Sequence, residues 1–173
     1  MNGHNTSPRP FTIRTHQSGD LGLITQRHGI FYAKEYGFDQ RFEALIARIM
    51  ADFIDNLQPN LERCWIAERD GEFLGCIMLV QDKQPNAAKL RLLFVEDNAR
   101  GLGVGTSLVQ QCINFAREAG YTCINLWTQS MLKGARRIYS KAGFELIETE
   151  DHESWGVRMT GEMWRLSLQP NKD

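Results

Sequence analysis

An arginine and closely spaced glycines lie where a predicted strand is followed by a helix. Arg100, Gly103 and Gly105 form the pattern Arg-x-x-Gly-x-Gly, and the apolar strand before them ends at Val95. After Gly105 the apolar residues recur at helical spacing. The unpaired N–H groups of a first helical turn and the positive end of its dipole attract anions, and glycines let a phosphate approach closely. This stretch therefore predicts a diphosphate-binding site.

Two other phosphate-binding motifs fail to match these glycines. A Walker loop needs a lysine directly after its last glycine, and none follows here. The dinucleotide fingerprint Gly-x-Gly-x-x-Gly needs glycine at 106 or 108, where the chain has Thr106 and Leu108. It also expects an acidic residue at the end of the next strand, and the stretch 125–128 has none. The pattern Arg-x-x-Gly-x-Gly instead resembles the acetyl-CoA pyrophosphate loop of the GNAT N-acetyltransferase superfamily.

A second motif follows the first after one further predicted strand. Ala135, Tyr139, Gly143 and Phe144 match the Ala-x-x-x-Tyr-x-x-x-Gly-Phe segment of the same superfamily. The resemblance covers residues 10–168. In the stretches 27–45, 89–93 and 135–139 the chain looks most like the acetyltransferase half of bacterial proteins that fuse a MarR-type winged-helix repressor to a GNAT domain. We expect no counterpart of that DNA-binding half in this sequence, so DNA binding does not carry over.

The resemblance implies an acetyl-CoA-dependent N-acetyltransferase that acts by direct transfer on the amine of a small molecule or peptide. Tyr139 matches the tyrosine that serves as general acid toward the thiolate. Many relatives carry an asparagine three residues before the motif alanine, where this chain has Leu132, so Asn125 and Thr128 are alternative contacts to the pantetheine arm. The other expected cofactor-binding residues act through their backbone: Leu93, Phe94 and Val95 toward pantetheine, and Arg100, Gly101, Gly103, Gly105 and Thr106 toward the pyrophosphate. The Arg100 side chain would add a charge-assisted contact.

The sequence does not identify the general base. The strand before the glycine loop offers no carboxylate, and its inward positions read as apolar. Glu35 and Asp39, between the first two predicted helices, are candidates, although a surface charge and a helix cap explain them better. His28 reads as a core or groove histidine, and a water chain could also act as base.

Composition places the chain among ordinary globular proteins. It has 173 residues, of which 42% are hydrophobic and 24% charged, with a formal net charge of −1. This balance gives no electrostatic argument for nucleic acid or an anionic membrane as partner, and we expect a cytoplasmic protein. No residue pattern suggests a metal site. Four cysteines without Cys-x-x-Cys spacing predict buried, reduced thiols.

The order of predicted elements indicates a single α/β domain over residues 10–169, after a flexible tail at 1–9. A strand at 11–15 precedes helices ending near Tyr36 and Pro59, and Asp70-Gly71 joins a hairpin of strands. The strands at 89–95 and 122–127 should be parallel, because a helix connects them. The chain would end in strands at 145–150 and 160–168, with a solvated acidic turn at 150–153. This is the GNAT arrangement: a mixed, mostly antiparallel sheet with flanking helices and a splayed parallel pair. Family resemblance also implies a homodimer through the C-terminal strands.

Two rival functions stay open at this point. One is a catalytically silent acyl-CoA-binding sensor, because no carboxylate base is evident. The other is a nucleotide-binding α/β protein, which would be stabilised by ATP or NAD in place of CoA.

Overall fold

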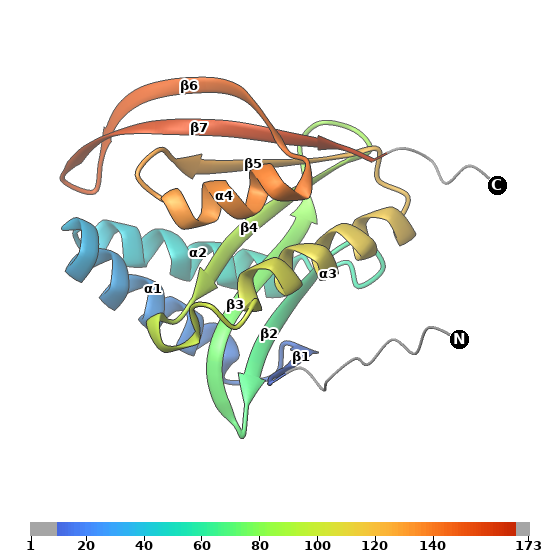
Figure 1. The fold of residues 1–173 in the computed structure, drawn as a ribbon, viewed down its shortest axis with the longest axis horizontal. Helices are drawn as coiled ribbons and strands as arrows, with labels where there is room; N and C mark the ends of the chain where they lie inside the picture. Colours follow the sequence, from blue (N-terminus) through green and yellow to red (C-terminus); the bar gives the residue numbers. More distant parts are fainter. Residues whose placement is uncertain (1–9, 169–173) are drawn as a thin grey trace.

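A computed structural model describes residues 10–168 and places them in a single mixed sheet with helices on both faces (Figure 1). The predicted tail at 1–9 and residue 169 lie outside the described residues. The seven strands have the order β1-β2-β3-β4-β5-β7-β6, and only β4 and β5 run parallel. The strands are β1 Thr12–Thr15, β2 Arg63–Arg69, β3 Glu72–Gln81, β4 Ala87–Val95, β5 Cys123–Gln129, β6 Glu145–Ser154 and β7 Val157–Ser167.

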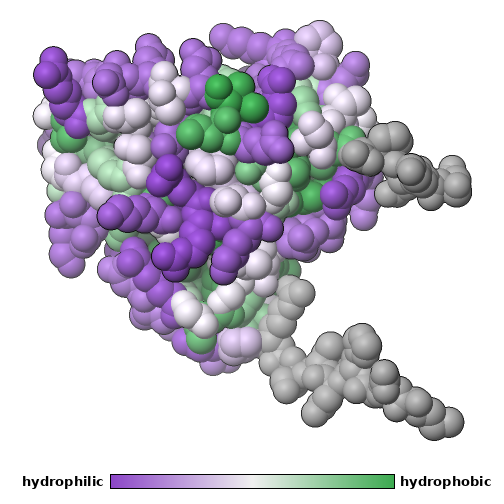
Figure 2. Space-filling view, turned by 45° about the horizontal axis from the view of Figure 1, so that its top comes forward, coloured by the Kyte–Doolittle hydropathy of each residue, from purple (hydrophilic) through white to green (hydrophobic). Residues whose placement is uncertain are grey.

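The helices form two layers around the sheet. One hydrophobic cluster joins α3 (Val104–Glu118) and α4 (Lys133–Ala142) to one face, and a second joins α1 (Asp20–Tyr36) and α2 (Gln40–Asp55) to the other. Successive residues of β2 alternate between the clusters, as the two-residue period of a strand requires. Figure 2 shows a face on which hydrophilic residues predominate around smaller hydrophobic groups. The predicted fold class and the parallel pair are therefore confirmed.

The turn between β2 and β3 has the geometry that its sequence predicts. Asp70 and Gly71 both have positive φ, at 53° and 79°. Two successive positive values are the mark of the type I′ turn that Asp-Gly favours. At the other end of the chain the prediction is wrong, because the acidic stretch 150–153 belongs to β6, and the turn lies at Trp155 and Gly156. These two residues also have positive φ, so a tight two-residue turn lengthens both strands.

The parallel pair separates along its length. β4 and β5 pair only from Ala87 with Cys123 to Leu90 with Leu126. Beyond Leu90, β4 stays bonded to β3 while β5 stays bonded to β7, and the two strands diverge (Figure 1). A bulge accompanies the divergence, since the register with β3 shifts by one residue and Leu92 takes φ 57°.

The four cysteines are all free and buried, as predicted. Cys64 and Cys76 belong to the cluster under α1 and α2, and Cys112 belongs to the cluster under α3 and α4. Burial raises the pKa of the Cys64 thiol to about 12 and raises the pKa values of Cys76 and Cys112 as well.

Candidate active site

A cleft of about 920 Å³ opens where β4 and β5 part. Its walls come from both helical layers, from the C-terminal part of β4, from the end of β5 and from the loop that precedes α3. The volume suits a cofactor-sized ligand. Because this gap interrupts the sheet, the cleft reaches through from the α3 and α4 side to the α1 and α2 side.

The β4 edge facing this cleft has unpaired backbone. Leu93, Phe94 and Val95 line the cleft, and they follow Leu90, the last residue paired with β5. On the opposite edge Phe94 and Val95 pair with Cys76 and Gly75 of β3. The N–H and C=O groups that point toward β5 therefore have no strand partner and are free to bond an extended ligand.

The glycine loop presents unused N–H donors at the start of α3. Among residues 10–168, no acceptor meets the N–H groups of Gly101, Gly103, Gly105 or Thr106. Gly101 and Gly103 have φ values of 81° and 79°, and a Cβ on either would point into open space. These two glycines are thus required by backbone conformation, and they leave the loop surface accessible to an anion.

Two residues of this loop, Arg100 and Gly105, also make contacts within the protein. The Arg100 N–H donates to the Asp97 carbonyl at 3.3 Å, where it closes a short 3-10 turn at Asp97–Ala99, and the Arg100 guanidinium pairs with the Asp97 carboxylate at 3.0 Å. Gly105 is buried, and a Cβ there would lie 2.7 Å from Cδ1 of Ile138. Gly105 is therefore a glycine because α3 packs closely on α4, while its N–H still belongs to the first helical turn.

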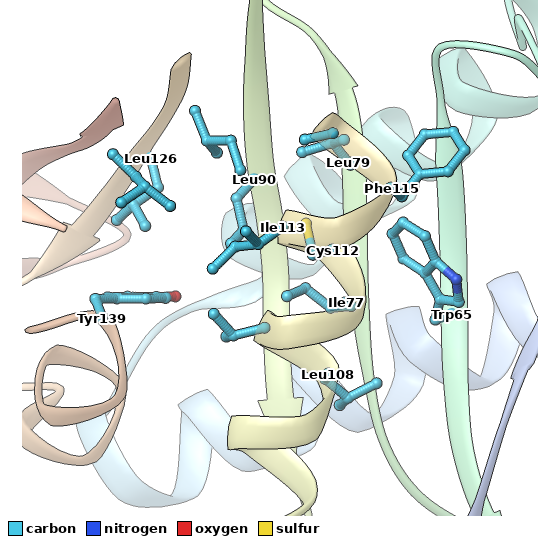
Figure 3. Packing of buried hydrophobic residues seen from close by; sticks show 14 of the residues in the cluster. Trp65, Ile77, Leu79, Leu90, Leu108, Cys112, Ile113, Phe115, Leu126 and Tyr139 are labelled. Atoms are coloured by element: carbon cyan, nitrogen blue, oxygen red, sulfur yellow. The ribbon is translucent and has the colours of Figure 1, made fainter. Parts of the chain in front are cut away.

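Tyr139 reaches the cleft from α4. Figure 3 shows its side chain projecting toward Leu90 and Ile113, across from β4. The residue is 4% exposed, and its hydroxyl has no hydrogen-bond partner within residues 10–168. Burial raises its pKa, so the hydroxyl stays protonated at neutral pH. A hydroxyl that opens onto a cleft wall and has no protein partner is available to a ligand.

His28, which the sequence reads as a core or groove histidine, lines the cleft. Its Nδ1 lies 2.8 Å from the carbonyl oxygen of Ile24, which can only accept, so Nδ1 carries the proton and Nε2 is left as a free acceptor. The ring packs against Tyr32 and Phe94. Burial lowers its pKa to about 4, so the ring is neutral at pH 7.

An ion pair fixes the segment around His28 relative to β4. The neighbouring Arg27 donates from Nε and Nη2 to both carboxylate oxygens of Glu96, at 2.5 and 2.9 Å. Glu96 follows β4 directly. This two-pronged contact joins α1 to the exit of β4, and it positions His28 beside Phe94.

The remaining predicted site residues separate into two groups. Thr128 is buried and lines the cleft, as does Leu132 at the start of α4. Asn125 does not: it lies on the paired part of β5, and its amide is bonded to Asp82 and Arg165 at 2.7 and 2.8 Å. The structure thus places Asn125 outside the cleft, because the splay begins only beyond its register position.

Neither carboxylate candidate for the base lines the cleft. Glu35 is exposed near the end of α1. Asp39 caps α2 by accepting from the Arg41 N–H at 3.0 Å, and it pairs with the Arg41 guanidinium. Helix capping thus explains Asp39, and the structure gives Glu35 no contact with the site.

The charged residues that do line the cleft are all basic. Within residues 10–168, no aspartate or glutamate forms part of its wall. Sequence analysis missed this feature, because the bulge at Leu92 hides which residues of β4 face inward. The basic side chains are Lys89, Arg91, Arg100, Lys133, Arg137 and Lys141.

Comparison with known proteins identifies the family of this chain. Residues 27–144 match the model of the acetyltransferase (GNAT) family. Over 121 residues the chain is 30% identical to N-acetyltransferase 8F1 of Rattus norvegicus, covering 68% of this chain and 51% of that protein. An uncharacterized N-acetyltransferase of Schizosaccharomyces pombe is 26% identical over 133 residues, which cover 77% of this chain and 79% of the relative. The chain thus spans only about half the length of the rat protein.

The fold recurs among solved structures. The Salmonella typhimurium protein yncA, solved with its cofactor acetyl-CoA, superposes with a TM-score of 0.76. The two chains are 16% identical, and the superposition covers 95% of this chain and 97% of the other. In the part of the chain that the structure describes, no helix is both long enough and apolar enough to cross a membrane. No group of acidic, histidine or cysteine side chains is arranged to hold a metal ion there.

Proposed function

The chain belongs to the acetyltransferase (GNAT) family, and from this premise we propose that it is an N-acetyltransferase that transfers an acetyl group from acetyl-CoA directly to an amine. One observation carries the proposal. The unpaired edge of β4, the unused N–H donors of the α3 start and the unpartnered Tyr139 hydroxyl all border one cleft. The acceptor is a small molecule or a peptide.

The residues present fit acetyl-CoA. Diphosphate oxygens would accept from the N–H groups of Gly101, Gly103 and Thr106, with Arg137 and Lys141 of α4 supplying positive charge. The amides of the pantetheine arm would pair with the free edge of β4 at Leu93–Val95. When bound, the cofactor supplies the acetyl group as an activated thioester. Thr128 stays a candidate contact to the same arm.

Tyr139 would assist the leaving sulfur. The acceptor nitrogen forms a bond to the acetyl carbon, the carbon–sulfur bond breaks, and its electron pair leaves with sulfur. The protonated hydroxyl donates a hydrogen bond to the sulfur as negative charge develops there, and passes on its proton as the thiol departs. Its lack of a protein partner leaves this bond available.

His28 would take the proton that the nitrogen loses. Its free Nε2 is the acceptor that the Ile24 bond leaves exposed to the cleft. A ring with a pKa of about 4 is a weak base, but the nitrogen becomes strongly acidic once it is bonded to the acetyl carbon. Proton gain at His28 and proton loss at Tyr139 leave the net charge of the cleft unchanged. The pair therefore removes the need for a carboxylate base.

The test combines ligand binding with turnover. Acetyl-CoA and CoA should raise the melting temperature, because a ligand at 100 times its Kd stabilises the fold by about 2.7 kcal/mol. ATP and NAD should not, and stabilisation by these nucleotides alone would favour a nucleotide-binding protein. Release of CoA thiol should then require an added amine. Binding of CoA without thiol release on any amine would identify the acyl-CoA sensor.

Other features of the proposal rest on the sequence resemblance. We propose that the likeness extends to the acetyltransferase half of MarR-type fusion proteins and that residues 10–169 are the catalytic domain. A cytoplasmic location and a homodimer through the C-terminal strands complete the proposed setting. Size-exclusion chromatography with light scattering tests the dimer directly.

A further inference from the structure

The cleft has a second basic region, apart from the glycine loop. Lys89 and Arg91 are alternate residues of β4, and both line the part of the cleft that α2 covers with Ile46 and Ile49. Lys89 belongs to the last paired segment of β4, and Arg91 is the first residue beyond it. Arg91 precedes Leu93 by two residues, or about 7 Å along a strand. These cations therefore lie near the reacting end of the cleft.

Neither cation has an acidic partner. Within residues 10–168, no carboxylate lies in ion-pair distance of Lys89 or Arg91, although both side chains are half-buried. Loss of hydration lowers the pKa of each, which marks an unfavourable setting for unpaired charge. Such a setting becomes favourable when an anion enters.

The acids nearest to this region are bound elsewhere or exposed. Asp82 accepts from the Asn125 amide and from the Lys83 N–H, both at 2.7 Å. Glu62 accepts from the backbone N–H groups of residues 58 and 81 at 3.2 Å. Asp52 borders an adjoining hollow of about 380 Å³ and is exposed. Lys89 and Arg91 also line this hollow, but none of its carboxylates comes within ion-pair distance of either cation in residues 10–168.

An apolar wall lines the same cleft beside the start of α2. Phe38, Phe42 and Trp155 pack together with ring centroids 5.0 Å apart, and all three line the cleft. Trp155 belongs to the turn between β6 and β7, and its carbonyl accepts a hydrogen bond from the Asp39 N–H at 3.0 Å. The hairpin is thereby held against the junction of α1 and α2, where it closes this end of the cleft.

Building on the proposed function, we propose that Arg91 and Lys89 bind a carboxylate of the acceptor, which is an amino acid with a large apolar side chain. In an α-amino acid one carbon joins the amine and the carboxylate, so binding of the carboxylate fixes the amine near Leu93. The aromatic wall receives the side chain. A polyamine finds no carboxylate here to pair with its cations, so it is a poor acceptor. The cations of the glycine loop and α4 serve the diphosphate separately.

The experiment compares L-phenylalanine with L-phenylalaninamide as acceptors. The amide keeps the ring, and its less basic amine is more fully deprotonated at neutral pH. A slower reaction of the amide therefore cannot come from protonation of its amine, and it reports the missing carboxylate. We expect kcat/KM for the amino acid to exceed that for the amide about 10- to 100-fold, as for loss of a charge-assisted contact. Arg91→Gln and Lys89→Gln should each raise KM for the amino acid, shrink its advantage over the amide, and leave KM for acetyl-CoA within about twofold.

Arg117→Gln is the matched control, because Arg117 is an exposed arginine of α3 outside the cleft. It should leave both acceptors unchanged. Equal use of the amide and the amino acid, or an unaltered KM in Arg91→Gln, would overturn the inference while the acetyltransferase activity stands. Calorimetric binding of L-phenylalanine to the CoA-loaded protein gives a readout that does not require turnover. Binding that Arg91→Gln abolishes supports the inference even if no acetyl group is transferred, and absence of binding contradicts it.

Discussion

The hydroxyl of Tyr139 faces the cleft and has no hydrogen-bond partner among residues 10–168, so a ligand can bond to it. Its removal in Tyr139→Phe leaves the aromatic packing against Phe144 in place, with ring centroids 5.7 Å apart. We expect kcat to fall about 100-fold, the loss typical of one donor to developing charge, while acetyl-CoA affinity stays nearly constant. Single-turnover stopped-flow measurement at saturating substrates checks the rate.

Tyr121→Phe provides the comparison for this substitution. The Tyr121 hydroxyl donates to the Leu61 carbonyl at 2.7 Å, far from any role in the cleft. Its loss should cost about 1 kcal/mol of unfolding free energy and leave kcat unchanged. An undiminished rate in Tyr139→Phe would remove that hydroxyl from the reaction.

The roles of His28 and of the basic residues of β4 could be predicted from the sequence only in part. Histidine at 28 was visible, but its tautomer depends on the Ile24 carbonyl and its exposure to the cleft depends on the splay. Arg91 was read as part of an apolar strand. The reason is the positive φ of Leu92, which is an unusual conformation for leucine. Tertiary structure imposes this conformation, and no local sequence pattern predicts it.

At the scale of elements, the site depends on how closely β4 packs on β3. Gly75 of β3 lies opposite Val95, and a Cβ there would overlap the carbonyl oxygen of Phe94. Gly75→Ala must therefore push β4 aside next to its bulge. We expect it to lower the free energy of unfolding by about 1–3 kcal/mol, the range for an overpacked core, and to weaken acetyl-CoA binding. Urea denaturation and calorimetry measure the two effects.

Gly22→Ala is the same change in an open place. Gly22 is exposed within α1, and a Cβ there meets no atom within 4 Å. Alanine should raise the unfolding free energy by about 0.5–1 kcal/mol, because glycine is the poorer helix former. If both variants gained stability, close packing of β3 on β4 would not be what requires glycine at 75.

The sequence predicted those elements well whose geometry depends on a few neighbouring residues. Asp70-Gly71 specifies its hairpin turn, and the glycine loop specifies the start of α3. The end of β6 was misjudged because charge along 150–153 suggested a turn, although an edge strand tolerates charge on its exposed positions. No local signal shows that Asn125 lies outside the cleft, because the point where β4 and β5 separate depends on both strands together.

At the scale of the whole molecule, burial of His28 makes stability depend on pH. The folded-state pKa is about 4, below the value of about 6.5 for an unfolded histidine. Between these values the unfolded chain binds a proton that the folded chain does not, so the unfolding free energy falls as pH falls. The full loss amounts to ~3 kcal/mol by pH 4. The depressed pKa of Asp20, beside Arg14, adds a further loss only below 3.8.

His28→Asn isolates this contribution. The asparagine amide can still donate to the Ile24 carbonyl, but it does not titrate. We expect the variant to lose its stability more gradually than the wild type between pH 6.5 and 4, as measured by urea denaturation at each pH. It should also lower kcat, because it lacks Nε2. Identical pH profiles in the two proteins would contradict a neutral, buried His28.

The burial of all four cysteines bears on how this protein can be assayed. Burial keeps disulfide reagents away from all four thiols. The raised pKa values of Cys64, Cys76 and Cys112 slow their reaction further, since the thiolate is the nucleophile. Native protein should therefore contribute little colour to a continuous titration with such a reagent, and the signal will report the coenzyme product. The same reagent added in denaturant should react with every cysteine. One chromophore can therefore follow turnover by the folded protein and also measure how much protein has unfolded on inactivation.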